Sequence, residues 1–322
     1  MERPLDFMPK VIRSEAGRSL GYDLYVYRSH LEVEKLDASV REGFTLAAAR
    51  RTVRATPDRF ARKWLQLRSS AYARERSFDE RVTPQLLHAI DVTECPVTRI
   101  TLTHGRLTDA DWSVDRLNND GGYAANNLAV MSARANKAKG RRTFDEVLLL
   151  ARAETPTDGL QPVEWMRLAS LMLGPCFATE PAKAPLLPHI APMTSHRLLV
   201  SSQQLQHVLC TLAVMQSGKN RLVKALRTAS ALQTAGLRLG ALGELLHRGL
   251  KGLDYGCDVW LQPGAMDALS HWLASLDLAA RGRVAELARQ LAGGRQVAPS
   301  RLQSWRLASR GYMHGCVSEP SH

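Results

Sequence analysis

The chain has 322 residues, a formal net charge of +12 and a pI near 9.8. Its apolar content of 45% is enough for hydrophobic cores, and its length allows two domains or one domain with an extension. The charge makes a phosphate backbone the expected counter-surface, with salt-sensitive binding. No stretch of eighteen apolar residues is present and no signal-peptide pattern follows Met1, so we expect a cytoplasmic protein without membrane contact.

Cysteine usage agrees with a reducing compartment. The five cysteines are scattered and include no Cys-x-x-Cys pair. We therefore expect neither a disulfide framework nor a structural zinc ion, and we interpret Cys95 as a small buried residue.

The first 82 residues divide into two predicted segments. In residues 1–40, alternating Tyr22, Leu24 and Val26 predict short strands. Residues 41–82 form a basic helical region broken near Pro57, in which eleven cations face five acids between Arg41 and Arg81. Such a run is usually a solvated helix surface, and the alternative is contact with duplex DNA.

Residues 83–153 carry the most informative pattern. Thr83 and Pro84 begin a helix that ends near Ile90. Strands are predicted from Trp112 to Leu117 and from Leu128 to Met131, joined by turn-forming residues 118–122. Ser132 can cap the next helix, and Thr143 with Glu146 forms a capping box that opens another helix through Ala153.

This strand–hairpin–strand–helix order predicts a metal site. Asp115 leaves the first strand facing Asn136 on the helix. Carboxylate and amide oxygens suit a single Mg²⁺ or Mn²⁺ ion, with water and a substrate phosphate completing its coordination. Taken alone, Asp115 is better explained as a turn residue at the end of a strand, and the alternative for Lys139 is a solvated C-terminal cation favoured by the helix dipole.

The stretch resembles the HNH nucleases, or ββα-metal nucleases, of the phage and mobile-element type. The matching residues are Asp115, Arg116, Gly122, Tyr123, Asn127, Asn136 and Lys139, and the similarity covers about residues 60–152. It implies an α+β module in a mostly α chain, with Asp115 and Asn136 as metal ligands. It also implies that Arg116 and Lys139 contact phosphate, and that Asn127 supports the hairpin with a further role in the site.

One departure from the family bears on activity. The best-known members have a histidine after the aspartate, which acts as general base, whereas this chain has Arg116. A guanidinium has no acceptor lone pair and cannot take the proton. Either another group such as His104 or a water acts instead, or arginine is ordinary in a working subgroup, or the module binds DNA without cleaving it.

We expect two clusters of cations to contact the backbone of duplex DNA. The first lies in the basic helical region and the second lies on and after the motif helix; their members are Arg62, Lys63, Arg68, Arg134, Lys137, Arg141 and Arg142.

The remainder of the chain is predicted from proline content and periodicity. Residues 154–195 hold seven prolines around a short helix and are interpreted as a linker or irregular surface segment. Residues 196–322 have helical periodicity and predict a bundle of unknown role, suited to target recognition, a protein partner or a homodimer.

The sequence therefore predicts a metal-dependent DNA endonuclease. The alternatives are a DNA-binding protein that has lost catalysis and a helical scaffold for partner proteins.

Overall fold

A computed structural model describes residues 10–28, 33–192, 200–230, 233–293, 307–308 and 312–313. The chain forms two compact units. The first contains the residues up to Asp91 together with Val114–Ala129, and the second contains Val92–Ser113 and the residues from Val130 onward. The structure is mostly helical (59%), with a small two-stranded antiparallel sheet, as the sequence predicted.

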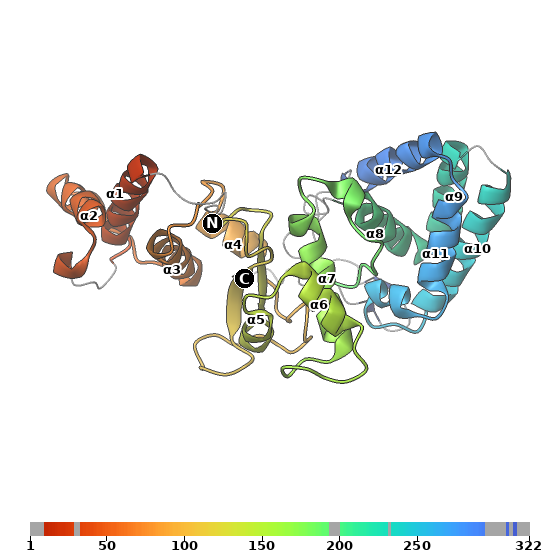
Figure 1. The fold of residues 1–322 in the computed structure, drawn as a ribbon, viewed down its shortest axis with the longest axis horizontal. Helices are drawn as coiled ribbons and strands as arrows, with labels where there is room; N and C mark the ends of the chain where they lie inside the picture. Colours follow the sequence, from red (N-terminus) through yellow and green to blue (C-terminus); the bar gives the residue numbers. More distant parts are fainter. Residues whose placement is uncertain are drawn as a thin grey trace, which may run out of the picture. The chain divides into compact units, whose positions relative to one another are not determined.

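The helices of the first unit precede the hairpin in the chain (Figure 1). They are α1 (Lys10–Val26), the 3₁₀ turn η1 (Val33–Lys35), α2 (Ala38–Ala49), α3 (Arg59–Ala73) and α4 (Pro84–Ala89). The break near Pro57 and the start of α4 at Pro84 agree with the predicted positions. Asp37, Asp58 and Thr83 cap α2, α3 and α4 through side-chain oxygens that accept backbone N–H groups.

The strands predicted in residues 1–40 are wrong, because α1 occupies residues 10–26. The alternation of Tyr22, Leu24 and Val26 coincides with a helical spacing, in which Leu20 and Leu24 are buried one turn apart. They pack with Val40 and Leu65 in the core of this unit.

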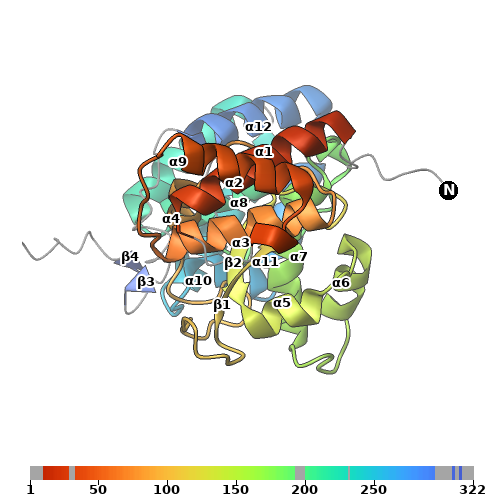
Figure 2. The same cartoon turned by 90° about the vertical axis from the view of Figure 1, so that its left-hand side faces the viewer.

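Glycines allow α1 and α2 to approach closely; Figure 2 shows these helices side by side. A Cβ atom at Gly21 would lie 1.8 Å from the Val40 carbonyl oxygen, and one at Gly43 would lie 1.9 Å from the Arg18 carbonyl oxygen. The two backbones are therefore too close for any larger residue at these positions.

The second unit contains the first two residues of the hairpin (Trp112 and Ser113), the part of its return strand from Val130 onward and the remaining helices. Its helices and 3₁₀ turns are α5 (Ala133–Lys139), α6 (Phe144–Ala151), α7 (Pro162–Cys176), η2 (Pro181–Lys183), α8 (Ser201–Ala213), α9 (Gln216–Ser230), α10 (Gln233–Leu250), η4 (Gly256–Leu261), α11 (Ala265–Ala274) and α12 (Leu278–Gly293). The short strands β3 (Leu307–Ala308) and β4 (Tyr312–Met313) pair with each other.

The short helix predicted within residues 154–195 is present as α7, but its burial makes the interpretation of this part as a surface segment wrong. This helix is fifteen residues long, and Trp165, Leu168 and Leu173 on it are fully buried. Pro162 stands in its first turn, where no donor is needed, and Pro175 stands at its end, so neither proline breaks it. The proline content therefore marks the ends of a buried helix.

The helical periodicity after residue 200 is confirmed. Helices α8 to α12 share one hydrophobic core that includes Leu209, Leu239, Trp260 and Trp272. The predicted boundary at His196 lies outside the described residues. None of the helices in the described ranges combines the length and apolar character needed to cross a membrane.

Candidate functional site

The secondary structure of the predicted motif is confirmed at nearly the predicted positions. Strand β1 (Trp112–Arg116) pairs with β2 (Leu128–Ser132), and α5 follows directly. The candidate residues are divided between the units: Asp115, Arg116 and Asn127 belong to the first, and His104, Asn136 and Lys139 belong to the second. Each group is described within its own unit.

In the first unit, Asn127 holds the hairpin loop closed. Its Oδ1 accepts the N–H of Asn118 at 2.7 Å, and its Nδ2 donates to the carbonyl oxygens of Asn118 and Gly122, each at 2.9 Å. The side chain is buried, with 6% of its surface exposed. Both polar atoms are thus used inside the loop, which agrees with the supporting role expected for Asn127.

Arg116 also acts within the loop. Its Nη1 donates to the carbonyl oxygens of Asn119 at 3.2 Å and Gly121 at 2.9 Å, and its guanidinium lies 5.0 Å from the centre of the Tyr123 ring. Arg116 therefore braces the turn.

The loop is fastened to the segment that follows α3. The rings of Tyr123 and Phe78 stack with centroids 5.8 Å apart. The Tyr123 N–H donates to the Ser77 carbonyl at 2.9 Å, and the Asp79 N–H donates to the Tyr123 carbonyl at 2.9 Å. Hydrogen bonds, chiefly from Arg81, lower the pKa of the Asp79 carboxyl. These contacts attach the hairpin to the basic helical region.

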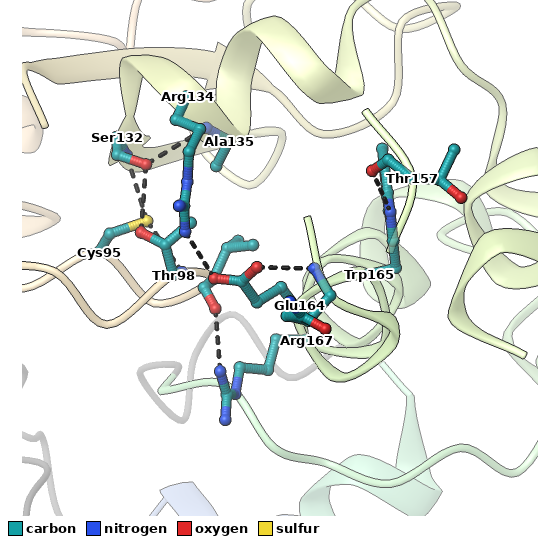
Figure 3. Close-up of polar contacts among 11 residues, drawn as sticks. Cys95, Thr98, Ser132, Arg134, Ala135, Thr157, Glu164, Trp165 and Arg167 are labelled. Carbon is teal, nitrogen blue, oxygen red and sulfur yellow. Dashed lines mark hydrogen bonds and ion pairs between the residues drawn. The ribbon is translucent and has the colours of Figure 1, made fainter. Parts of the chain in front are cut away.

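In the second unit, a buried network sets the start of α5 (Figure 3). The Cys95 sulfur accepts the N–H groups of Ser132 at 3.2 Å and Thr98 at 3.4 Å, while the Ser132 hydroxyl accepts the N–H of Ala135 at 3.2 Å. Arg134 donates to Glu164 on α7 at 2.7 Å. Cys95 is buried as expected, and its sulfur also serves as an acceptor.

Asn136 contacts the first strand through Ser113. Its Nδ2 donates to the Ser113 hydroxyl at 2.7 Å, which orients the amide and leaves the carbonyl oxygen as the atom suited to a cation. Asp115 is half-buried and supplies a carboxylate. The described residues include no group of three or more His, Cys, Asp and Glu side chains suited to a metal.

His104 lies on an exposed loop before β1. The loop is held by Asp111, whose carboxylate accepts the Thr103 hydroxyl at 2.6 Å and the N–H groups of Arg106 at 3.2 Å and Leu107 at 2.7 Å. The His104 ring lies 5.8 Å from the Trp112 ring. The loop is tied to α5, since Ala133 N–H donates to the Asp111 carbonyl at 2.7 Å.

Several predicted DNA contacts have roles inside the protein. Arg68 forms an ion pair with Asp23, Arg134 pairs with Glu164, and Arg142 pairs with Asp158. Arg142 also donates to the Ala138 carbonyl at 2.6 Å. Arg68 thereby links α3 to α1 and Arg134 links α5 to α7, whereas Arg142 joins the segments before and after α6. DNA contact by these three arginines stays a prediction.

The other predicted contacts differ in exposure. Arg62, Lys137 and Arg141 are exposed. Lys63 is half-buried, its Nζ donates to Gln66 at 3.1 Å, and burial lowers the pKa of its ammonium group. Lys139 has no exposed surface. Lys139 is therefore not a solvated cation at the end of α5, and contact with a phosphate would require its side chain to move.

The sequence analysis did not identify Phe78, Asp79 or Ser113 as parts of this region. Ser113 stands two residues before Asp115, so strand alternation was an available signal. For Phe78 and Asp79 the sequence holds no local signal of these contacts, because Tyr123, which both residues contact, lies more than forty residues away. Comparisons of the chain with models of protein families, with characterised proteins and with solved structures find no match.

Proposed function

We propose that this protein is a divalent-metal-dependent endonuclease of the HNH type that hydrolyses phosphodiester bonds in DNA. The observation that supports the proposal is the hairpin and capped helix at the motif positions, with Asn127 closing the loop. The net charge of +12 supports an anionic substrate.

In this proposal Asp115 and Asn136 hold the metal. Loss of Mg²⁺ binding in Asp115→Ala and in Asn136→Ala would support this assignment, and unchanged Mg²⁺ binding in both would refute it. A bound Mg²⁺ or Mn²⁺ ion would polarise the phosphate and lower the pKa of a bound water. The chain's own residues then have three tasks: Ser113 orients the Asn136 amide, Arg116 and Asn127 keep the loop closed, and His104 or a second water accepts the proton.

A second function follows from Arg116. Its guanidinium is engaged with two loop carbonyls and cannot act as a base, which favours a DNA-binding protein without cleavage. Both functions include salt-dependent DNA binding, and only the nuclease requires Asp115 for a chemical step.

Supercoiled plasmid incubated with Mg²⁺ or Mn²⁺, and in parallel with EDTA, tests the proposal. We expect cleavage that EDTA abolishes and that Asp115→Ala reduces by at least about 100-fold while leaving DNA affinity within a few-fold. Asp120→Ala is the matched control, because Asp120 is an exposed aspartate in the same hairpin.

Arg116→His separates the two functions. Cleavage by Arg116→His with none by the native protein would establish a binding protein that lacks its base. Because this change also removes the bonds to Asn119 and Gly121, Arg116→Gln provides the control for loop damage. Absence of metal-dependent cleavage from the native protein and from Arg116→His would refute the nuclease proposal for this substrate.

A further inference from the structure

The loop between α2 and α3 presents a dense set of exposed cations. Arg50, Arg51, Arg54 and Arg62 are all exposed, and we call these four residues the basic loop surface. Asp58 is the acid between positions 50 and 62. Its carboxylate caps α3 by accepting the Ala61 N–H at 2.7 Å. The surface therefore has a strong local excess of positive charge.

This loop has a defined conformation. The Thr52 N–H donates to the Ala47 carbonyl at 3.1 Å, and the Ala55 N–H donates to the Val26 carbonyl at 2.7 Å. The hydroxyls of Tyr22 and Thr52 are 3.1 Å apart. The bonds to Val26 and Tyr22 tie the loop to the C-terminal end of α1, so its arginines project from a fixed backbone.

Two of the guanidinium groups are also positioned. Arg54 lies 5.0 Å from the Tyr25 ring centre, and its Nε donates to the Tyr25 carbonyl at 3.3 Å. Arg62 reaches back from α3, and its Nη1 donates to the Pro57 carbonyl at 3.0 Å. Each of these bonds uses one of the five guanidinium N–H donors, so most donors can still bind an anion.

A solvated helix end is the simpler explanation for such cations, since positive charge is favoured at the C-terminus of α2. That effect reaches only the last turn and does not account for Arg54 and Arg62. Four exposed arginines with one acid between positions 50 and 62, on a loop of fixed conformation, suit a large anionic partner.

We propose that the basic loop surface binds the sugar–phosphate backbone of duplex DNA. This inference rests on the proposed function, because it assigns the DNA contact of the first unit to the loop. It keeps Arg62 from the contacts expected from the sequence, and it adds Arg50, Arg51 and Arg54 in place of Arg68, which is paired with Asp23. The fork of each guanidinium suits two oxygens of one phosphate.

Binding of a fluorescent duplex of about thirty base pairs, measured by anisotropy over a range of KCl concentrations, tests the proposal. Each phosphate contact contributes about 0.9 to the slope of log Kd against log salt. The triple variant Arg50→Gln, Arg51→Gln, Arg54→Gln should lower that slope by about 2.7 and weaken binding at least about ten-fold at low salt.

The control removes three cations from the helical part of the second unit. Arg221→Gln, Lys224→Gln and Lys251→Gln change exposed residues and give the same net charge as the test variant. The control slope should stay within about 0.5 of the native slope. An equal fall in both variants would overturn the proposal in favour of a diffuse charge effect.

The outcomes distinguish a failure of this inference from a failure of the proposed function on which it rests. Absence of binding by the native protein refutes the proposed function and the loop surface together. Native binding with an unchanged slope in the test variant refutes the loop surface alone.

Chemical modification of arginine tests the same proposal on the native protein, in case the triple variant does not fold. Native protein treated with phenylglyoxal, with and without duplex, should show protection of Arg50, Arg51 and Arg54 by mass spectrometry. Equal modification in both samples would contradict the proposal.

Discussion

Removal of the Asn127 side chain gives the sharpest test of the hairpin geometry. Asn127→Ala deletes three hydrogen bonds, at 2.7, 2.9 and 2.9 Å, from a side chain that is 6% exposed. At about 1 kcal/mol net for each bond, the loss is about 3 kcal/mol. Water reaching the half-buried Asn118 and Gly122 would reduce this to about 2 kcal/mol.

The quantity to measure is local, because two units make a single global unfolding free energy ill-defined. Hydrogen exchange of peptides spanning residues 117–128 reports the opening free energy of the loop. Asn127→Ala should lower it by about 2 to 3 kcal/mol, which is a 30- to 150-fold faster exchange. Asn126→Ala, at the exposed neighbouring position, should leave exchange unchanged.

Asn127→Asp tests the direction of the bonds. The carboxylate keeps an acceptor for the Asn118 N–H and places negative charge against two carbonyl oxygens, so it should open the loop at least as much as alanine. Unchanged exchange in Asn127→Ala would refute the argument from three bonds. Unchanged exchange with loss of Mg²⁺ binding would instead assign Asn127 to the metal.

Two further predictions concern the cores. Burial, and to a smaller extent the neighbouring His207, lowers the pKa of His189 to about 3. When the pH falls below about 6.5, His189 therefore takes up a proton in the unfolded chain but not in the folded chain. Stability of the second unit should drop by about 2 kcal/mol from pH 7 to pH 5, and an equally steep loss in His189→Gln would contradict this. Gly21→Ala should unfold the α1–α2 pair, because its Cβ atom would overlap the backbone of α2. Gly282→Ala should stabilise α12 by about 1 kcal/mol, because its Cβ atom would have no other atom within 4 Å. Equal shifts of the melting temperature in the two variants would contradict the packing argument.

Local chemistry explains what could be predicted from the sequence. The caps at Thr83, Ser132 and Thr143 each accept an N–H group three residues away, so the pattern and its effect lie within a few residues of sequence. The strand pair also follows from residues that lie close together in the sequence. The predicted site residues therefore lie on the expected elements.

Tertiary packing explains what could not be predicted. Helix α1 depends on glycines that admit the backbone of α2, and an alternation of apolar residues does not reveal a neighbouring helix. Likewise, Arg68 and Asp23 are 45 positions apart, so the sequence did not show that this cation has an internal partner. Charge runs indicate how many cations are present, and the fold decides which of them face solvent.

The assignment of residues 114–129 to the first unit has a genetic consequence. The polypeptide passes between the units three times, after Asp91, Ser113 and Ala129. No single truncation yields either unit by itself, because residues 92–113 of the second unit interrupt the first. Deletion of the first 91 residues would strip the hairpin of its anchors at Ser77 and Phe78. Recombination could therefore not exchange the first unit as one cassette, and its basic helices and its hairpin would have to be inherited together.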